Sequence, residues 1–215
     1  MAASPVLPDA SGGVSPDTLP LDEVLPLVAK LDAADAELLR THPAVATFER
    51  LPFYAAAGLL RATALVPQPV MLRFVYARRD HRLYPTGSPE LVRAANAAVG
   101  LRLRADAAVA YVRFYLEVSG NEGWAGRRLV ADADEVPWLP ETLTDPGSKD
   151  ARARLSARIP RARAVADSGG ALVVTAATVR GQTLEVVAFR VAADGAVSVR
   201  PLNTLTEDAP VVQVL

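Results

Sequence analysis

Apolar residues in the first third of the chain recur three or four positions apart. The spacing from Leu21 to Val28 is that of one face of an α-helix. Asp32 stands before a second such stretch and is a typical N-cap, because its carboxylate accepts hydrogen bonds from the first backbone N–H groups of a helix. A further helical region is expected over residues 43–65. The pattern therefore predicts that residues 21–66 are helical.

The apolar period changes to two in the middle of the chain. Apolar and aromatic side chains at every second position predict a strand over residues 70–76, with residues 81–84 returning as a short partner strand. Helix 89–99 is expected next, because it opens on a Ser-Pro-Glu sequence and is followed by Gly100, a common helix terminator. A second helix is expected over residues 106–118. This middle region is therefore mixed.

The last part of the chain is rich in Val, Thr and Ala. Its runs are joined by Arg180-Gly181-Gln182 and Ala193-Asp194-Gly195, which are hairpin turn signals. Strands joined by turns this short are antiparallel neighbours, so the runs predict a meander. The predicted strands of the meander are 172–179, 183–191 and 196–202; a strand over 124–130 and a helix over 149–158 are also expected.

These elements predict an α+β fold with a helical N-terminal third, a mixed β-hairpin and helix middle, and a C-terminal antiparallel β-meander. Residues 1–20 contain four Pro and no apolar period, so we expect a disordered tail there. We expect residues 21–215 to form a single globular domain, divided into helical 21–66, mixed 67–148 and β-rich 149–215. An uncovered edge of the meander would make a dimer possible through strand pairing.

Composition narrows the chemistry. The chain has 215 residues, no Cys and two His, which excludes catalytic thiols, Cys-ligated metals and a three-His zinc site. No metal and no cofactor are expected. Arg outnumbers Lys by 21 to 2, which is typical of a GC-rich bacterial genome. No uncharged run approaches the ~20 residues that span a bilayer, and residues 1–14 lack the basic start of a secretion signal. We therefore expect a soluble, cytoplasmic protein with no membrane contact.

Sequence motifs exclude several enzyme classes. The chain contains no phosphate-binding loop, dinucleotide fingerprint, zinc-protease motif or nucleophile elbow. An acidic stretch from Asp132 to Asp145 does not fit a calcium loop, because Pro137 stands where Gly is needed and Leu143 where an acid is needed. These absences disfavour an enzyme.

Basic and aromatic residues gather around the predicted hairpin at residues 70–84. Residues 40–128 carry thirteen Arg against six acidic residues, which suits them to steering an anionic partner. Arginine side chains bind carboxylates and phosphates through two parallel hydrogen bonds. A merely solvated turn is the competing explanation, since turns carry polar residues for backbone reasons. The candidate ligand-binding residues are Arg73, Arg78, Arg79, His81, Arg82, Tyr76 and Tyr84.

His81 is the candidate for general acid or base catalysis, and the sequence identifies no other catalytic residue. A neighbouring residue in a strand points to the opposite face, so Asp80 is poorly placed to orient the His81 ring. The orienting carboxylate would have to come from elsewhere in the chain.

Two further segments are candidates for partner binding. Trp138 lies between two prolines, where it either fills a gap in the core or forms a docking patch. Residues 149–163 are strongly basic but contain no aromatic residue for base stacking, so nucleic-acid binding is disfavoured. We expect this stretch to be a solvated helix that faces the acidic residues 129–148.

The leading hypothesis is a non-catalytic accessory or binding protein. A protein partner or a small anionic ligand would bind the hairpin at residues 70–84 and the aromatic residues beside it. The first alternative is a small-molecule enzyme that uses His81 as general acid or base. The second alternative is nucleic-acid binding through residues 149–163.

Overall fold

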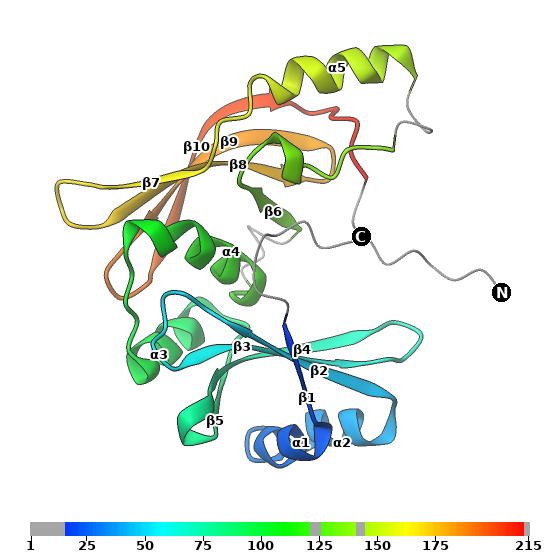
Figure 1. The fold of residues 1–215 in the computed structure, drawn as a ribbon, viewed down its shortest axis with the longest axis vertical. Helices are drawn as coiled ribbons and strands as arrows, with labels where there is room; N and C mark the ends of the chain where they lie inside the picture. The colour runs from blue at the N-terminus through cyan, green and yellow to red at the C-terminus, as the bar shows by residue number, and fades with distance from the viewer. Residues whose placement is uncertain (1–15, 121–125, 141–144, 213–215) are drawn as a thin grey trace.

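The computed structural model describes residues 16–120, 126–140 and 145–212. Two antiparallel sheets are separated by a layer of helices, and further helices cover the outer face of each sheet (Figure 1). The fold therefore alternates helical and sheet layers, and the expected α+β class is confirmed.

The N-terminal sheet is a meander in which each strand pairs with the next one along the chain. The β4–β5 pair, joined by the helical turn η1, confirms the predicted hairpin. The strands are β1 (Asp17–Leu19), β2 (Ala44–Arg50), β3 (Ala57–Ala64), β4 (Val70–Ala77) and β5 (Arg82–Pro85), and η1 is Arg78–Asp80.

Helices α1 (Leu21–Ala29) and α2 (Ala33–Thr41) cover the outer face of this sheet. Asp32 caps α2 as expected, because its Oδ1 accepts hydrogen bonds from the backbone N–H groups of Ala34 and Asp35 at 2.7 and 3.1 Å. The apolar side chains of α1 and α2 pack against Phe48, Leu60 and Phe74 of the sheet. This outer core holds the hairpin against α1.

The helix expected over residues 43–65 is wrong, because this segment forms β2 and β3. Leu59 and Leu60 point to opposite faces of β3, yet both are buried because helices cover both faces of the sheet. A strand buried on both faces is continuously apolar and cannot be distinguished from a buried helix by its period. The helical part of the N-terminal third therefore ends with α2.

The expected disordered tail over residues 1–20 is also corrected in part. Asp17–Leu19 form β1, which pairs with β2 and buries Leu19. Backbone hydrogen bonds to the edge of β2 order this segment, and they require no apolar period. Residues 1–15 lie outside the described residues.

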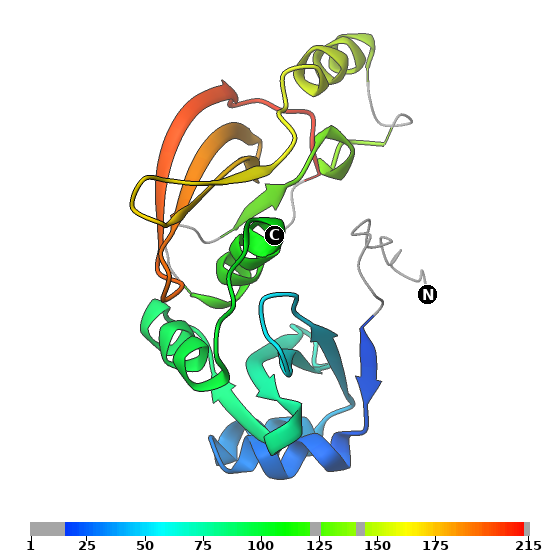
Figure 2. The same cartoon turned by 60° about the vertical axis from the view of Figure 1, so that its left-hand side comes forward.

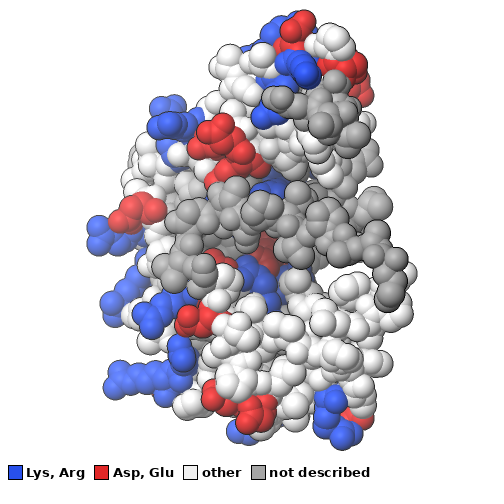
Figure 3. Space-filling model, turned by 45° about the vertical axis from the view of Figure 1, so that its right-hand side comes forward, with Lys and Arg blue, Asp and Glu red and all other residues white. Residues whose placement is uncertain are grey.

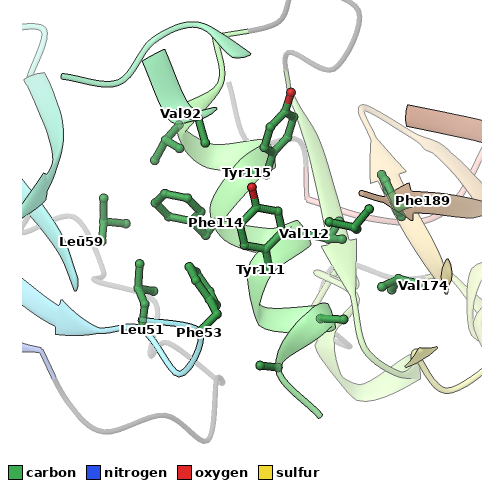
Figure 4. Close-up of a cluster of buried hydrophobic side chains, with 14 of the residues drawn as sticks. Leu51, Phe53, Leu59, Val92, Tyr111, Val112, Phe114, Tyr115, Val174 and Phe189 are labelled. Carbon is green, nitrogen blue, oxygen red and sulfur yellow. The ribbon is translucent and has the colours of Figure 1, made fainter. Parts of the chain in front are cut away.

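Helices α3 (Pro89–Val99) and α4 (Ala108–Val118) form the central layer. Both agree with the expected helices, and α3 ends at Gly100, whose φ is +77°. Figure 2 shows α4 between the two sheets. In Figure 4, Tyr111 and Phe114 of α4 lie between Leu59 of the N-terminal sheet and Phe189 of the C-terminal sheet. The α4 aromatic residues Tyr111, Phe114 and Tyr115 are all buried.

The C-terminal sheet has the strand order β10-β9-β8-β6, with β7 paired to the same strand β8. β6 and β7 pair with opposite ends of β8, at Ala177–Arg180 and Leu172–Thr175. The β8–β9–β10 meander confirms the prediction. The strands are β6 (Arg127–Val130), β7 (Arg163–Ala166), β8 (Leu172–Arg180), β9 (Thr183–Val191) and β10 (Val197–Thr206).

Helix α5 (Pro146–Ser156) covers part of the outer face of this sheet. Its Leu155 packs with Val179, Leu184 and Leu205 in a third buried cluster, which Val136 and Ala209 also join. A turn of 3-10 helix, η4 (Ala133–Glu135), precedes it in the chain.

A buried chain of hydrogen bonds joins the two sheets through the central helices. The Tyr54 hydroxyl donates to Asn96 Oδ1 at 2.5 Å, and Asn96 Nδ2 donates to the Tyr111 hydroxyl at 2.8 Å. Tyr111 in turn donates to the carbonyl of Gly195 in the β9–β10 turn at 2.7 Å. Tyr54 follows β2, so these bonds link the loops of both sheets to α3 and α4.

Candidate functional site

The candidate site begins at the turn between β4 and β5. After the single helical turn of η1, His81 adopts the left-handed conformation, with φ 47° and ψ 47°. This conformation is uncommon outside glycine, although histidine tolerates it better than most residues. The chain reverses here and enters β5 at Arg82, so the charged residues of the turn lie at the exposed end of the hairpin.

Alternation along the strands divides the predicted ligand-binding residues between the two faces of the sheet. Arg73, Arg82 and Tyr84 share the face of Val75, toward α4, because directly paired residues lie on the same face. Tyr76 lies on the opposite face, toward α1 and α2. The seven predicted residues therefore do not line one pocket.

Arg73 belongs to a network of ion pairs between the N-terminal sheet and α4. Arg61 of β3 holds Glu117 through two hydrogen bonds, Nε–Oε1 at 2.6 Å and Nη2–Oε2 at 2.8 Å. Its third nitrogen, Nη1, donates to Glu49 at 2.8 Å, and Arg73 Nε donates to Glu117 at 3.2 Å. The charge of Arg73 is therefore already compensated by the protein.

Glu117 stays ionised in this network. Its burial raises the pKa of the carboxyl group, but the hydrogen bonds from Arg61 and the charges of Arg61 and Arg73 lower the pKa by a larger amount. The net pKa lies below the ordinary value for glutamate. Arg61 and Glu117 are 56 positions apart in the chain, and no local pattern in the sequence connects them.

The cations at the end of the hairpin are compensated much less. Arg78 lies 3.7 Å from Asp17, and both side chains are about half exposed. Arg82 stacks over the ring of Tyr84, with its Cζ 5.2 Å from the ring centre. Arg79 is exposed and forms no ion pair within the described residues.

A shallow hollow of about 320 Å³ lies between the hairpin end and the C-terminal end of α1. Helix α1 contributes Leu27, Lys30 and Leu31 to its lining, and the hairpin contributes Asp80, His81, Arg82 and Leu83. Lys30 thus adds a cation that the sequence analysis did not assign to this site. It is remote from the hairpin in the sequence, so only the packing of α1 against β5 brings it there.

The His81 ring lies against Tyr76. Its Nδ1 is 3.3 Å from the Tyr76 hydroxyl, and within the described part of the chain no carboxylate hydrogen-bonds or pairs with the ring. Burial raises the pKa of Tyr76, so its hydroxyl stays protonated at neutral pH. A hydroxyl holds the ring but does not stabilise an imidazolium as a carboxylate does. Among the described residues, His81 therefore has a hydroxyl neighbour for its ring rather than a carboxylate.

Trp138 lies in the outer layer of the C-terminal sheet. Its Nε1 donates to the carbonyl of Ala133 at 3.0 Å, its backbone pairs with Val211, and it packs against the buried cluster under α5. Arg152 of α5 lies 5.8 Å from its ring centre. Its side chain is half-buried among these contacts, and its partner-binding role stays a prediction.

The basic residues 149–163 contact the stretch 129–148 through Arg152, which lies over the ring of Trp138, and the expected pairing of their opposite charges stays a prediction. Within the described residues, the loop residue Glu135 pairs instead with Arg113 of α4, and no ion pair joins the two segments. Residues 141–144 of the loop lie outside the described residues.

Neither a metal site nor a membrane span is found in the described ranges. No group of three His, Cys, Asp or Glu side chains there is arranged to hold a metal ion. No helix among the same residues is long and apolar enough to cross a bilayer.

No protein-family model matches this chain, and neither a curated protein nor a solved structure is significantly similar to it. Function is therefore inferred from the geometry and chemistry described above.

Proposed function

We propose that this chain is a non-catalytic binding protein whose basic hairpin end takes an anionic group of a protein partner or small ligand. The binding residues would be Arg78, Arg79, His81 and Arg82, together with Lys30 of α1. The hollow between α1 and β5 would receive the anion.

One observation carries this proposal: some basic side chains of the molecule are paired with a carboxylate of the protein, whereas others are not. Arg61, Arg113 and Arg127 lie in or beside the central layer, and each pairs with a glutamate. In contrast, neither Lys30 nor Arg79 forms an ion pair within the described residues. Lys30 lines the hollow and Arg79 directly precedes its lining residue Asp80 in the chain, and uncompensated cations so placed favour the binding of an external anion.

The hairpin geometry suits recognition better than chemistry. Guanidinium groups bind carboxylate or phosphate through paired hydrogen bonds, and Lys30 would add a point charge from the other wall of the hollow. Tyr76 fixes the orientation of His81, so the ring can contribute a hydrogen bond to the anion. Arg73 and Tyr84 are omitted from the proposed set, because Arg73 is paired with Glu117 and Tyr84 is an uncharged residue whose ring stacks against Arg82.

Titration with citrate and with inorganic phosphate tests the proposal. We expect saturable binding by calorimetry that survives added salt, and at a hundred times the Kd a gain of about 2.7 kcal/mol in unfolding free energy. The double variant Lys30→Ala, Arg79→Ala should bind at least about tenfold more weakly, because two charge-assisted contacts are lost.

Arg200→Ala is the control, because Arg200 is an exposed arginine on β10 of the other sheet and forms no ion pair within the described residues. It should bind the anions as the unchanged protein does. Equal loss of binding in the control, or unchanged binding in the double variant, would exclude the hairpin as the site.

A further inference from the structure

A second hollow, of about 530 Å³, lies on the opposite side of the molecule from the hairpin. It opens between the C-terminal end of α5 and the end of β10. In Figure 1 these elements lie at the top, whereas the hairpin of β4 and β5 lies in the lower half. The volume falls within the range of small-molecule sites in proteins, about 300–1,000 Å³.

The floor of this hollow is apolar. Leu155 of α5 and Leu205 of β10 line it, and both belong to the buried cluster on the outer face of the C-terminal sheet. Ala151 and Ala157 extend the apolar lining along α5. Small side chains at these positions leave room for the body of a ligand.

The rim of the hollow is positively charged. Arg154 and Arg158 are four positions apart on α5 and its C-terminal turn, so they lie on the same side of the helix. Both are exposed, and within the described residues neither forms an ion pair or a hydrogen bond through its side chain. Asp208 is the acidic residue of the lining, so two guanidinium groups face one carboxylate.

We propose that this hollow binds an amphipathic carboxylic acid. The carboxylate would lie between Arg154 and Arg158, and the hydrocarbon chain would cover Leu155 and Leu205. An arginine pair matches the two oxygens of a carboxylate, and the hydrocarbon chain removes the exposed part of the apolar lining, including Ala151 and Ala157, from water. Among the described residues no aromatic side chain lines the hollow, so they offer no stacking surface to a nucleotide base.

This inference is independent of the proposed function, because the two sites share no residue. The basic stretch 149–163 acquires a role that differs from nucleic-acid binding: its arginines recognise the acidic head of a small ligand. The negative charge of Asp208 would repel that head, so removal of this charge should strengthen binding.

Decanoate below its micelle concentration is the probe, and its binding to the full chain is measured by calorimetry and by NMR shifts. We expect saturable binding that is at least about tenfold tighter than that of 1-decanol, because the alcohol lacks the charged head. The double variant Arg154→Ala, Arg158→Ala should weaken decanoate binding at least about tenfold. Asp208→Asn should tighten it, because a repelling charge is removed.

The hairpin variant Lys30→Ala, Arg79→Ala is the control and should bind decanoate as the unchanged protein does. All the substituted residues are exposed, so circular dichroism should show an unchanged fold. Absence of decanoate binding, equal affinity for decanol, or unchanged affinity in the α5 double variant would each overturn the proposal. Weaker binding to the Asp208→Asn variant would overturn the placement of the head beside Asp208.

Discussion

Arginine side chains in this protein have one of two environments, and the environment decides what each can do. Arg61 is held by Glu117 and Glu49 in a half-buried network. Arg79 is exposed at the end of the hairpin and has no such partner among the described residues. On the face drawn in Figure 3, basic and acidic side chains lie beside one another along the left-hand side and at the top. The composition alone, near-neutral overall, conceals this difference.

Substitution of Glu117 by Gln should lower stability most at neutral pH. Because the folded-state pKa of Glu117 lies below its ordinary value of 4.5, its ionised form stabilises the fold fully above that pH. This stabilisation is lost as the pH falls through the folded-state pKa. We expect Glu117→Gln to cost about 1–3 kcal/mol at pH 7.

Urea unfolding of both proteins between pH 7 and pH 3 checks this expectation. The difference between the unchanged protein and the variant should shrink below about pH 4.5, as the unchanged carboxyl group is protonated. Glu37→Gln is the control, because Glu37 forms an exposed pair with Arg40 on α2 and should have little effect. A pH-independent difference for Glu117→Gln would contradict the pKa assignment.

At the scale of the elements, the packing of β3 against β2 requires glycine at position 58. A Cβ atom at Gly58 would lie 2.7 Å from two ring carbons of Phe48 and still closer to the Glu49 carbonyl oxygen. Since β2 and β3 are paired here, the strands cannot separate without breaking backbone hydrogen bonds. Gly58→Ala should therefore destabilise the protein by about 1–3 kcal/mol.

The same substitution at Gly147 is the control, because it should leave the stability of the protein unchanged or raise it. Gly147 lies in the first turn of α5, its φ is not positive, and its nearest neighbour is a side-chain oxygen of Asp145. Alanine favours a helix over glycine by up to about 1 kcal/mol, so Gly147→Ala should keep or raise the midpoint of urea unfolding. Equal midpoints for the two alanine variants would show that the β2–β3 packing tolerates a larger residue.

Local signals in the sequence were sufficient for elements with distinct caps, turns or periods. Ser88 and Gly100 bound α3, and the Arg180-Gly181-Gln182 turn joins β8 to β9, as expected. β3 was mistaken for helix because layers on both sides remove the polar face that marks a strand, whereas β2 keeps an alternation of buried and more exposed residues that the expected helix 43–65 overlooked. The paired arginines were unpredictable for a related reason: Arg61 meets Glu117 only when α4 packs on the sheet.

The molecule as a whole depends on the layer between its two sheets. Apolar side chains of α3 and α4 contact both sheets there, and the hydrogen bonds of Asn96 run through the same layer. Burial raises the pKa of both Tyr54 and Tyr111, so each keeps its hydroxyl proton at neutral pH. The Asn96 amide oxygen accepts from Tyr54 and its amide nitrogen donates to Tyr111 and to the Asp194 carbonyl, which makes Asn96 the central residue of the contact.

Asn96→Ala should therefore weaken both sheets together. The variant leaves the Tyr54 hydroxyl and the Asp194 carbonyl without their bonds to Asn96, and a buried polar group without a partner costs about 1–3 kcal/mol. We expect one cooperative transition at lower urea, with faster amide exchange in both β3 and β9. Asn203→Ala, at an exposed position of β10, should leave exchange unchanged. If exchange in Asn96→Ala rises in β9 and β10 while β3 stays protected, the two sheets unfold separately and the central layer does not couple them.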